Sequence, residues 1–248
     1  MATFNSTGTG GNWTDDSTWA EAGQPAADGT DYVIITAGDT VVLTANTGTG
    51  AISIQGEITG AGFTLTLAGS GDSPLVNFDG TITSSSVLNL TIIADENNSI
   101  DCLGTGTFNN VIIDNTGYTT TLTHTLECAS LTITAGTLDT GSDKTLTVTG
   151  DVNINGSSSI LTTNSSAVTI GALSTTASGI YNATDNAAGT IINSRHSSNG
   201  RGISCGGVSS FVHKGGIVVF QGASAGVQGI LINGTATSTV GLYDVEIN

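Results

Sequence analysis

The chain has 248 residues, of which 35 are glycine, two are proline and 10% are charged, and its mean hydropathy is +0.19. So few charges exclude charge-driven disorder, and no apolar run reaches the roughly 18 residues that a membrane-spanning helix needs. The formal net charge is −16, which argues against nucleic acid or an anionic membrane as a partner, since phosphate contacts require Lys and Arg.

Residues 1–11 are small, polar and rich in glycine, which predicts an N-terminal arm. The two tryptophans of the chain, Trp13 and Trp19, follow it. The start lacks the basic and apolar regions of a secretory signal peptide. Because the first coil of a stack of strands needs a cover over its apolar interior, we interpret both tryptophans as a structural cap. A role in stacking against carbohydrate is the alternative.

Residues 12–41 resemble the tryptophan-bearing entry of right-handed parallel β-helix (pectate-lyase-like β-solenoid) proteins of bacteria and phages, and the entry of the eight-glycine domain. The matching residues are Asn12-Trp13-Thr14, Thr18-Trp19, Gly23 to Pro25, Asp31, Val33, Ile35, Gly38, Thr40 and Val41. The resemblance implies a right-handed β-helix that begins after an N-terminal arm and cap over residues 1–30. It implies no activity.

Short strands and turns alternate from residue 31 to residue 248. Leu131 and Ile133, for example, alternate with Thr132 and Thr134. Strict alternation places the apolar side chains on one face of a strand and the threonines on the other. No helical period interrupts this pattern, so the sequence predicts an all-β fold.

The second apolar residue of each predicted strand recurs every 15 to 22 residues. These anchors are Ile35, Ile54, Val76, Ile92, Ile113, Ile133, Ile154, Ile170, Ile192, Val212, Ile232 and Ile247. A recurring period of this size indicates a solenoid. We therefore predict a single parallel β-helix of about 11 coils over residues 31–248, with Ile113, Ile133 and Ile154 stacked in one interior column.

Carboxylates gather in the turns between residues 51 and 108, at Asp72, Asp79, Asp95, Glu96 and Asp101. Oxygen-rich turns can bind calcium, which takes six to eight oxygen ligands. Neither the EF-hand spacing nor the nonapeptide of calcium-binding β-rolls is present. The sequence therefore predicts no cofactor, with calcium as the alternative.

Residues 193–214 break the alternation. They contain five of the seven Lys, Arg and His residues of the chain, namely Arg195, His196, Arg201, His213 and Lys214. An arginine and a histidine on a loop of a β-helix could act as base and electrophile. The favoured interpretation is a candidate interaction loop that contacts an acidic coil of a neighbouring subunit. No catalytic or metal-binding residue is assigned.

The three cysteines, Cys102, Cys128 and Cys205, suit neither a disulfide scaffold nor a zinc site. Buried, reduced thiols are expected, as in a protein assembled in a reducing cytoplasm. The last strand ends at Ile247 without a cap, so we expect a partner or a symmetry mate to cover its edge.

The charge is unevenly distributed, because residues 1–143 contain 16 Asp and Glu residues and no Lys or Arg. A basic protein surface or divalent cations would suit this half, although the carboxylates also keep a threonine-rich surface soluble. Clustered carboxylates or a base with calcium, as polysaccharide-degrading β-helix enzymes use, are not recognised in the sequence.

Together these features favour a non-enzymatic structural protein of a bacteriophage virion, either a capsid decoration (cement) protein or a fibre. The expected partners are phage capsid or tail proteins, with a host glycan as a further alternative. The resemblance to phage β-helix proteins implies a homotrimer, with contacts through Phe211, Val218, Phe220 and Leu242. Two other functions remain open: a secreted or cell-surface bacterial β-solenoid adhesin, and a tailspike-like polysaccharide lyase or hydrolase.

Overall fold

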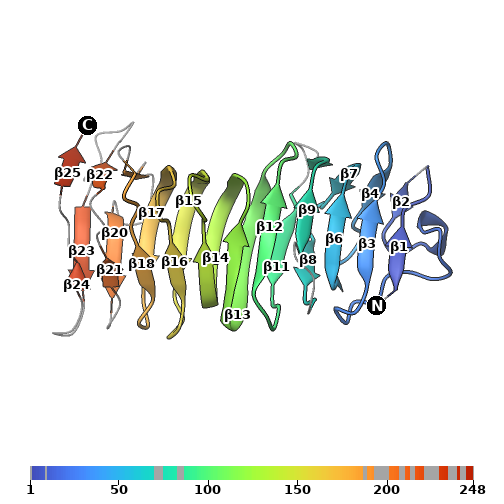
Figure 1. Ribbon diagram of the computed structural model, residues 1–248, viewed down its shortest axis with the longest axis horizontal. Coiled ribbons are helices and arrows are strands. Elements are labelled where there is room, and N and C mark those ends of the chain that lie inside the picture. The colour runs from blue at the N-terminus through green and yellow to red at the C-terminus, as the bar shows by residue number, and fades with distance from the viewer. Residues whose placement is uncertain are drawn as a thin grey trace. The chain divides into compact units, whose positions relative to one another are not determined.

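The structure, a computed structural model, describes residues 2–8, 10–69, 75–82, 87–186, 189–192, 201–206, 210–212, 216–220, 229–233, 239–240 and 244–247. The chain divides into two compact units, Met1–His124 and Thr125–Asn248. Each unit consists of short strands that pair in parallel with the equivalent strands of the next coil (Figure 1). The prediction of an all-β parallel solenoid is confirmed. The domain bounds predicted from the sequence, residues 1–30 and 31–248, stay a prediction.

The first unit has three columns of parallel strands. The first column contains β1 (Thr3–Asn5), β3 (Tyr32–Ile35), β6 (Ala51–Ile54), β9 (Val76–Phe78), β12 (Asn98–Cys102) and the end of β13 (Phe108–Leu122). The second contains β5 (Thr47–Thr49), β8 (Thr64–Leu67), β11 (Asn89–Ile92) and the beginning of β13. The third contains β2 (Gly11–Asn12), β4 (Thr40–Val42), β7 (Glu57–Thr59) and β10 (Thr81–Ile82). A 3-10 helix, η1 (Asp16–Thr18), lies between β2 and β3.

The second unit also has three columns, numbered here fourth to sixth. The long strands β14 (Leu126–Asp139), β15 (Leu146–Ile154) and β17 (Val168–Thr175) run through the fourth and fifth columns, and β14 also reaches the sixth. The fourth column continues through β19 (Thr190–Ile192), β22 (Ile217–Phe220) and β25 (Asp244–Ile247). The fifth continues through β20 (Arg201–Gly206) and β23 (Gly229–Asn233). The sixth contains the end of β14, then β16 (Ile160–Thr162), β18 (Ile180–Asn182), β21 (Ser210–Val212) and β24 (Thr239–Val240).

The aliphatic side chains of the strands form the core of each unit. In β14, Leu131 and Ile133 are fully buried, whereas Thr132 and Thr134 between and after them are half-buried. Ile133 lies beside Ile154 of the next coil, as predicted, and Ile154 is also fully buried. Each fully buried isoleucine contributes about 1.5–3 kcal/mol of hydrophobic stabilisation, so the inward rows supply much of the stability of the stack.

The coils differ from the prediction in number and in length. Tyr32 pairs with Ala51, 19 positions later, but Ile52 pairs with Val76, 24 positions later. In the second unit Ile180 pairs with Ser210, 30 positions later. The loops at the corners vary in length, and many coils are longer than the average spacing of about 19 residues between the predicted anchors. The number of coils predicted from that spacing is therefore too high.

The N-terminal residues differ from the prediction of an arm. Phe4 of β1 pairs with Val33 of β3 and is 8% exposed. Residues 3–5 are therefore the first strand of the first column. Their alternation extends over three residues, which is too short for a periodic signal in the sequence.

Candidate functional site

Trp13 and Trp19 are buried in the first unit, with 1% and 3% of their surfaces exposed. Their rings meet edge to face, with centroids 5.2 Å apart, and the Trp19 indole N–H donates to the Trp13 carbonyl oxygen at 2.9 Å. Phe4 of β1 packs edge-on against Trp19 at 6.3 Å. Aromatic rings in this arrangement bury a large apolar area against the first strand. Neither indole presents an open face against which a sugar could stack.

The segment that carries Trp19 also hydrogen-bonds to the outer edge of the first strand. One edge of β1 pairs with β3, and this pairing continues where the Ser6 N–H donates to the Ile34 carbonyl at 2.9 Å. On the opposite edge, the Ala20 N–H donates to the Asn5 carbonyl at 2.8 Å. Ser6 and Trp19 form an antiparallel bridge there. The tryptophan segment therefore covers part of an edge that would otherwise be open to pairing.

Glu21 also hydrogen-bonds to this edge of β1, a contact that no pattern in the sequence indicates. Its Oε2 accepts the Asn5 backbone N–H at 2.8 Å, and its Oε1 accepts the Asn5 side-chain amide at 3.0 Å. The hydrogen bond from the Asn5 backbone N–H, supported by the side-chain amide, lowers the pKa of the Glu21 carboxyl group. The ionised carboxylate is the form that accepts both bonds, which is why they favour it.

A second cluster joins adjacent coils at the C-terminal end of the first unit. His124 Nδ1 lies 2.6 Å from Asp101 Oδ1, and 37% and 23% of the two side chains are exposed. Cys102 follows Asp101, and burial, together with the Asp101 charge, raises the pKa of its thiol to about 12. A nucleophilic cysteine needs a lowered pKa, so this set of residues is not arranged for thiolate catalysis. The contact between His124 and Asp101 instead links two coils.

At one corner of the second unit, side-chain and backbone groups of three successive coils are joined by hydrogen bonds. Asp139 Oδ1 accepts the Gly141 N–H at 2.7 Å and the Asn164 side-chain amide at 2.6 Å. On the next coils, the Thr184 hydroxyl donates to the Ser166 carbonyl at 2.8 Å. These polar groups have their hydrogen-bond partners within the fold. We infer that they fix the register between the coils at this corner.

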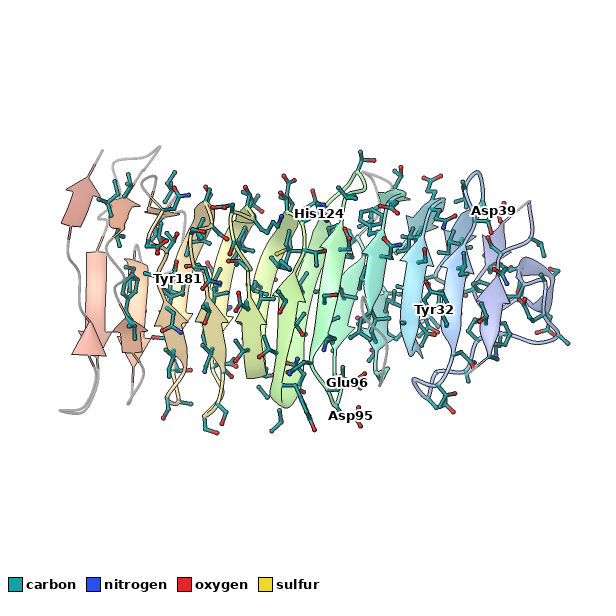
Figure 2. The ribbon with its side chains drawn as sticks, viewed as in Figure 1. Tyr32, Asp39, Asp95, Glu96, His124 and Tyr181 are labelled. Carbon is teal, nitrogen blue, oxygen red and sulfur yellow. The ribbon has the colours of Figure 1, made fainter. Side chains whose placement is uncertain are left out.

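Tyr181 is a buried phenol of the second unit (Figure 2). Its hydroxyl lies 2.8 Å from the Thr190 hydroxyl, and its ring packs against Phe211 with centroids 5.0 Å apart. Burial raises the pKa of the phenol to about 12. It therefore stays protonated near neutral pH and serves packing.

The predicted interaction loop is described only in part. Arg201 begins β20, where its backbone pairs with Gly229. Arg195, His196, His213 and Lys214 lie outside the described residues. The role of this loop stays a prediction.

The residues predicted to form trimer contacts are not on the surface where the structure describes them. Phe211 and Val218 are each 1% exposed and belong to the core of the second unit. The side chain of Phe220 and all of Leu242 lie outside the described residues. Phe211 and Val218 therefore face the core and do not form the predicted contacts, whereas contacts through Phe220 and Leu242 stay a prediction.

The acidic turns of the first unit project from the coils. Asp79 and Asp95 are exposed and Glu96 is half-buried, with Asp95 and Glu96 on the turn between β11 and β12 (Figure 2). Asp72 lies outside the described residues. Within the part of the chain that the structure describes, no three His, Cys, Asp or Glu side chains are placed to hold a metal ion. Calcium binding stays an alternative that rests on sequence alone.

Among the described residues, no helix is both long enough and apolar enough to cross a membrane. Comparison with known proteins finds no match: no family model, no curated protein and no solved structure corresponds to this chain.

Proposed function

We propose that the protein is a non-enzymatic structural component of a bacteriophage particle, a capsid decoration protein or a fibre, that acts by assembly. The supporting observation is the charge of the first unit, whose 124 residues contain 13 Asp and Glu residues and no Lys or Arg. The second unit contains seven acidic and four basic residues. A solenoid whose charged side chains are almost all acidic suits docking onto a basic protein surface. Such charges attract a partner of opposite charge and help to select it.

The assignment to a phage rests on the likeness of residues 12–41 to the entry of phage and bacterial β-helix proteins. That likeness also motivates a capsid or tail protein as the partner and a homotrimer as the assembled state. The buried thiol of Cys128 and the raised pKa of the Cys205 thiol, caused by burial, are compatible with assembly in a reducing cytoplasm.

The first test begins with the genomic neighbourhood, in which the proposal expects genes for capsid or portal proteins. Particles assembled from the neighbouring capsid gene are then mixed with the purified chain and sedimented at low and at high salt. We expect co-sedimentation that weakens as salt increases, because exposed charges are screened beyond about 8–10 Å at physiological ionic strength.

Two matched triple variants assign the binding surface. One neutralises three exposed carboxylates of the first unit: Asp15→Asn, Asp16→Asn and Asp79→Asn. The control neutralises three exposed carboxylates of the second unit: Glu127→Gln, Asp143→Asn and Asp185→Asn. The first variant should lose about tenfold or more in affinity for the particle and the control much less. Equal losses would contradict the assignment to the first unit.

Other outcomes would replace the proposal. Release of oligosaccharide from a host glycan, abolished by changing Arg195 or Arg201, would favour a polysaccharide lyase or hydrolase. Binding to bacterial cells without any affinity for capsid or tail proteins would favour an adhesin.

A further inference from the structure

Among the described residues, β1 pairs with another strand, β3, along one edge only. Phe4 in β1 and Ser6 just after it direct their backbone groups toward β3, so Thr3, Asn5 and Thr7 direct theirs toward the opposite, outer edge. Outward N–H and C=O groups of this kind are a template for pairing with a strand of another chain.

Three backbone groups of this outer edge are hydrogen-bonded to residues 18–21. The Thr7 N–H donates to the Thr18 carbonyl at 2.9 Å, and the Asn5 carbonyl accepts the Ala20 N–H at 2.8 Å. The Asn5 N–H is the third group, and its acceptor is a side chain, Glu21 Oε2, at 2.8 Å. The carboxylate therefore takes the position in which a neighbouring strand would place a carbonyl oxygen. Its second oxygen is fixed by the Asn5 side-chain amide at 3.0 Å.

We propose that the Glu21 carboxylate closes the outer edge of β1 against a strand of a second copy of this chain. A second copy presents parallel strands with the same alternation and the same inter-strand spacing of about 4.8 Å, so its main chain matches an open β1. Glu21 occupies the Asn5 N–H donor and places a charge on the edge, and both effects oppose such pairing. This role is independent of whether the protein belongs to a phage particle.

The closure depends on pH in a defined direction. The groups that lower the pKa of Glu21 are the Asn5 backbone N–H, the Asn5 side-chain amide and the backbone of Glu21 itself, while partial burial opposes them. No charged side chain of the described residues contributes to this shift. Because the pKa of Glu21 in the folded state lies below its ordinary value of 4.5, the charged closure is fully present above that value and is weakened as the pH falls through the folded pKa.

The variant Glu21→Ala tests the proposal by sedimentation velocity and light scattering over a range of protein concentrations at pH 7. We expect the average mass of the variant to increase with concentration, because an open β1 edge can pair with a second copy, whereas the mass of the wild type stays constant. Asp79→Ala is the control, since it removes one exposed carboxylate of the same unit, away from β1. Glu21→Gln keeps one oxygen that can accept the Asn5 N–H but loses the charge, as protonation does, so it should associate less than Glu21→Ala and more than the wild type.

Hydrogen exchange of the Asn5 amide gives a second measurement that works even if Glu21→Ala does not fold. In the wild type, the protection factor of this amide should fall on the order of tenfold as the pH falls through the Glu21 pKa, located by NMR titration of its carboxyl group, and in Glu21→Gln it should not change over the same range. The proposal is overturned if Asp79→Ala associates as strongly as Glu21→Ala. It is equally overturned if the Asn5 protection factor in the wild type does not respond to pH.

Discussion

Replacement of Ile133 by alanine tests the central feature of the fold, which is that alternate residues of each strand point into the stack. Ile133 is fully buried and lies beside Ile154 of the next coil, which is also fully buried. The substitution removes three carbon atoms, and at about 0.8 kcal/mol for each buried methylene the lost transfer free energy is about 2.4 kcal/mol. The cavity left between the coils raises the expected total to about 3–4 kcal/mol, within the range of about 2–5 kcal/mol seen for such truncations.

Urea denaturation followed by circular dichroism measures this loss as a lower midpoint at an unchanged slope. The matched control is Thr132→Ala in the same strand, because this side chain is half-buried on the opposite face. It should change the free energy of unfolding by no more than about 0.5 kcal/mol. If Thr132→Ala cost as much as Ile133→Ala, or if Ile133→Ala cost less than about 1 kcal/mol, the assignment of inward and outward faces would be wrong.

Three further predictions concern local features. A Cβ at position 156 would collide with the Thr134 carbonyl oxygen of the preceding coil, so Gly156→Ala should lower the free energy of unfolding by about 1–3 kcal/mol. The control is Gly8→Ala, whose Cβ would meet no atom within 4 Å, and it should leave this free energy unchanged in the same urea titration. Iodide should quench little of the emission of Trp13 and Trp19 in the folded protein, because both are buried, and full quenching would contradict their role as a cap. Iodoacetamide should modify Cys102 slowly at pH 8, because its raised pKa of about 12 keeps the thiol protonated, and rapid modification without denaturant would refute this.

The sequence by itself determined the fold class and the inward face of the strands. Alternation of apolar residues with threonine is a local property with a period of two, and it requires no knowledge of distant parts of the chain. Leu131 and Ile133 could therefore be placed in the core from the order of amino acids alone. Trp13 and Trp19 could be expected to be buried from their position ahead of the first regular strand. All four are buried.

The tertiary structure alone decided which strands lie beside one another. Ile154 and Ile170 were predicted to be consecutive members of one series, but Ile154 pairs with Thr175, while Ile170 pairs with Val148. The two isoleucines belong to neighbouring columns of the same long strands. Alternation distinguishes inside from outside but does not distinguish one column from the next, because the corners between columns have variable length.

The hydrogen bonds that define the candidate sites are also properties of the folded chain. Glu21 reaches Asn5 across 16 positions, and His124 reaches Asp101 across 23 positions, and neither pair has a recognisable spacing. Each contact exists because a coil brings distant residues to adjacent levels of a stack. The sequence therefore determined what each strand buries, and the closure of the coils determined which polar groups meet.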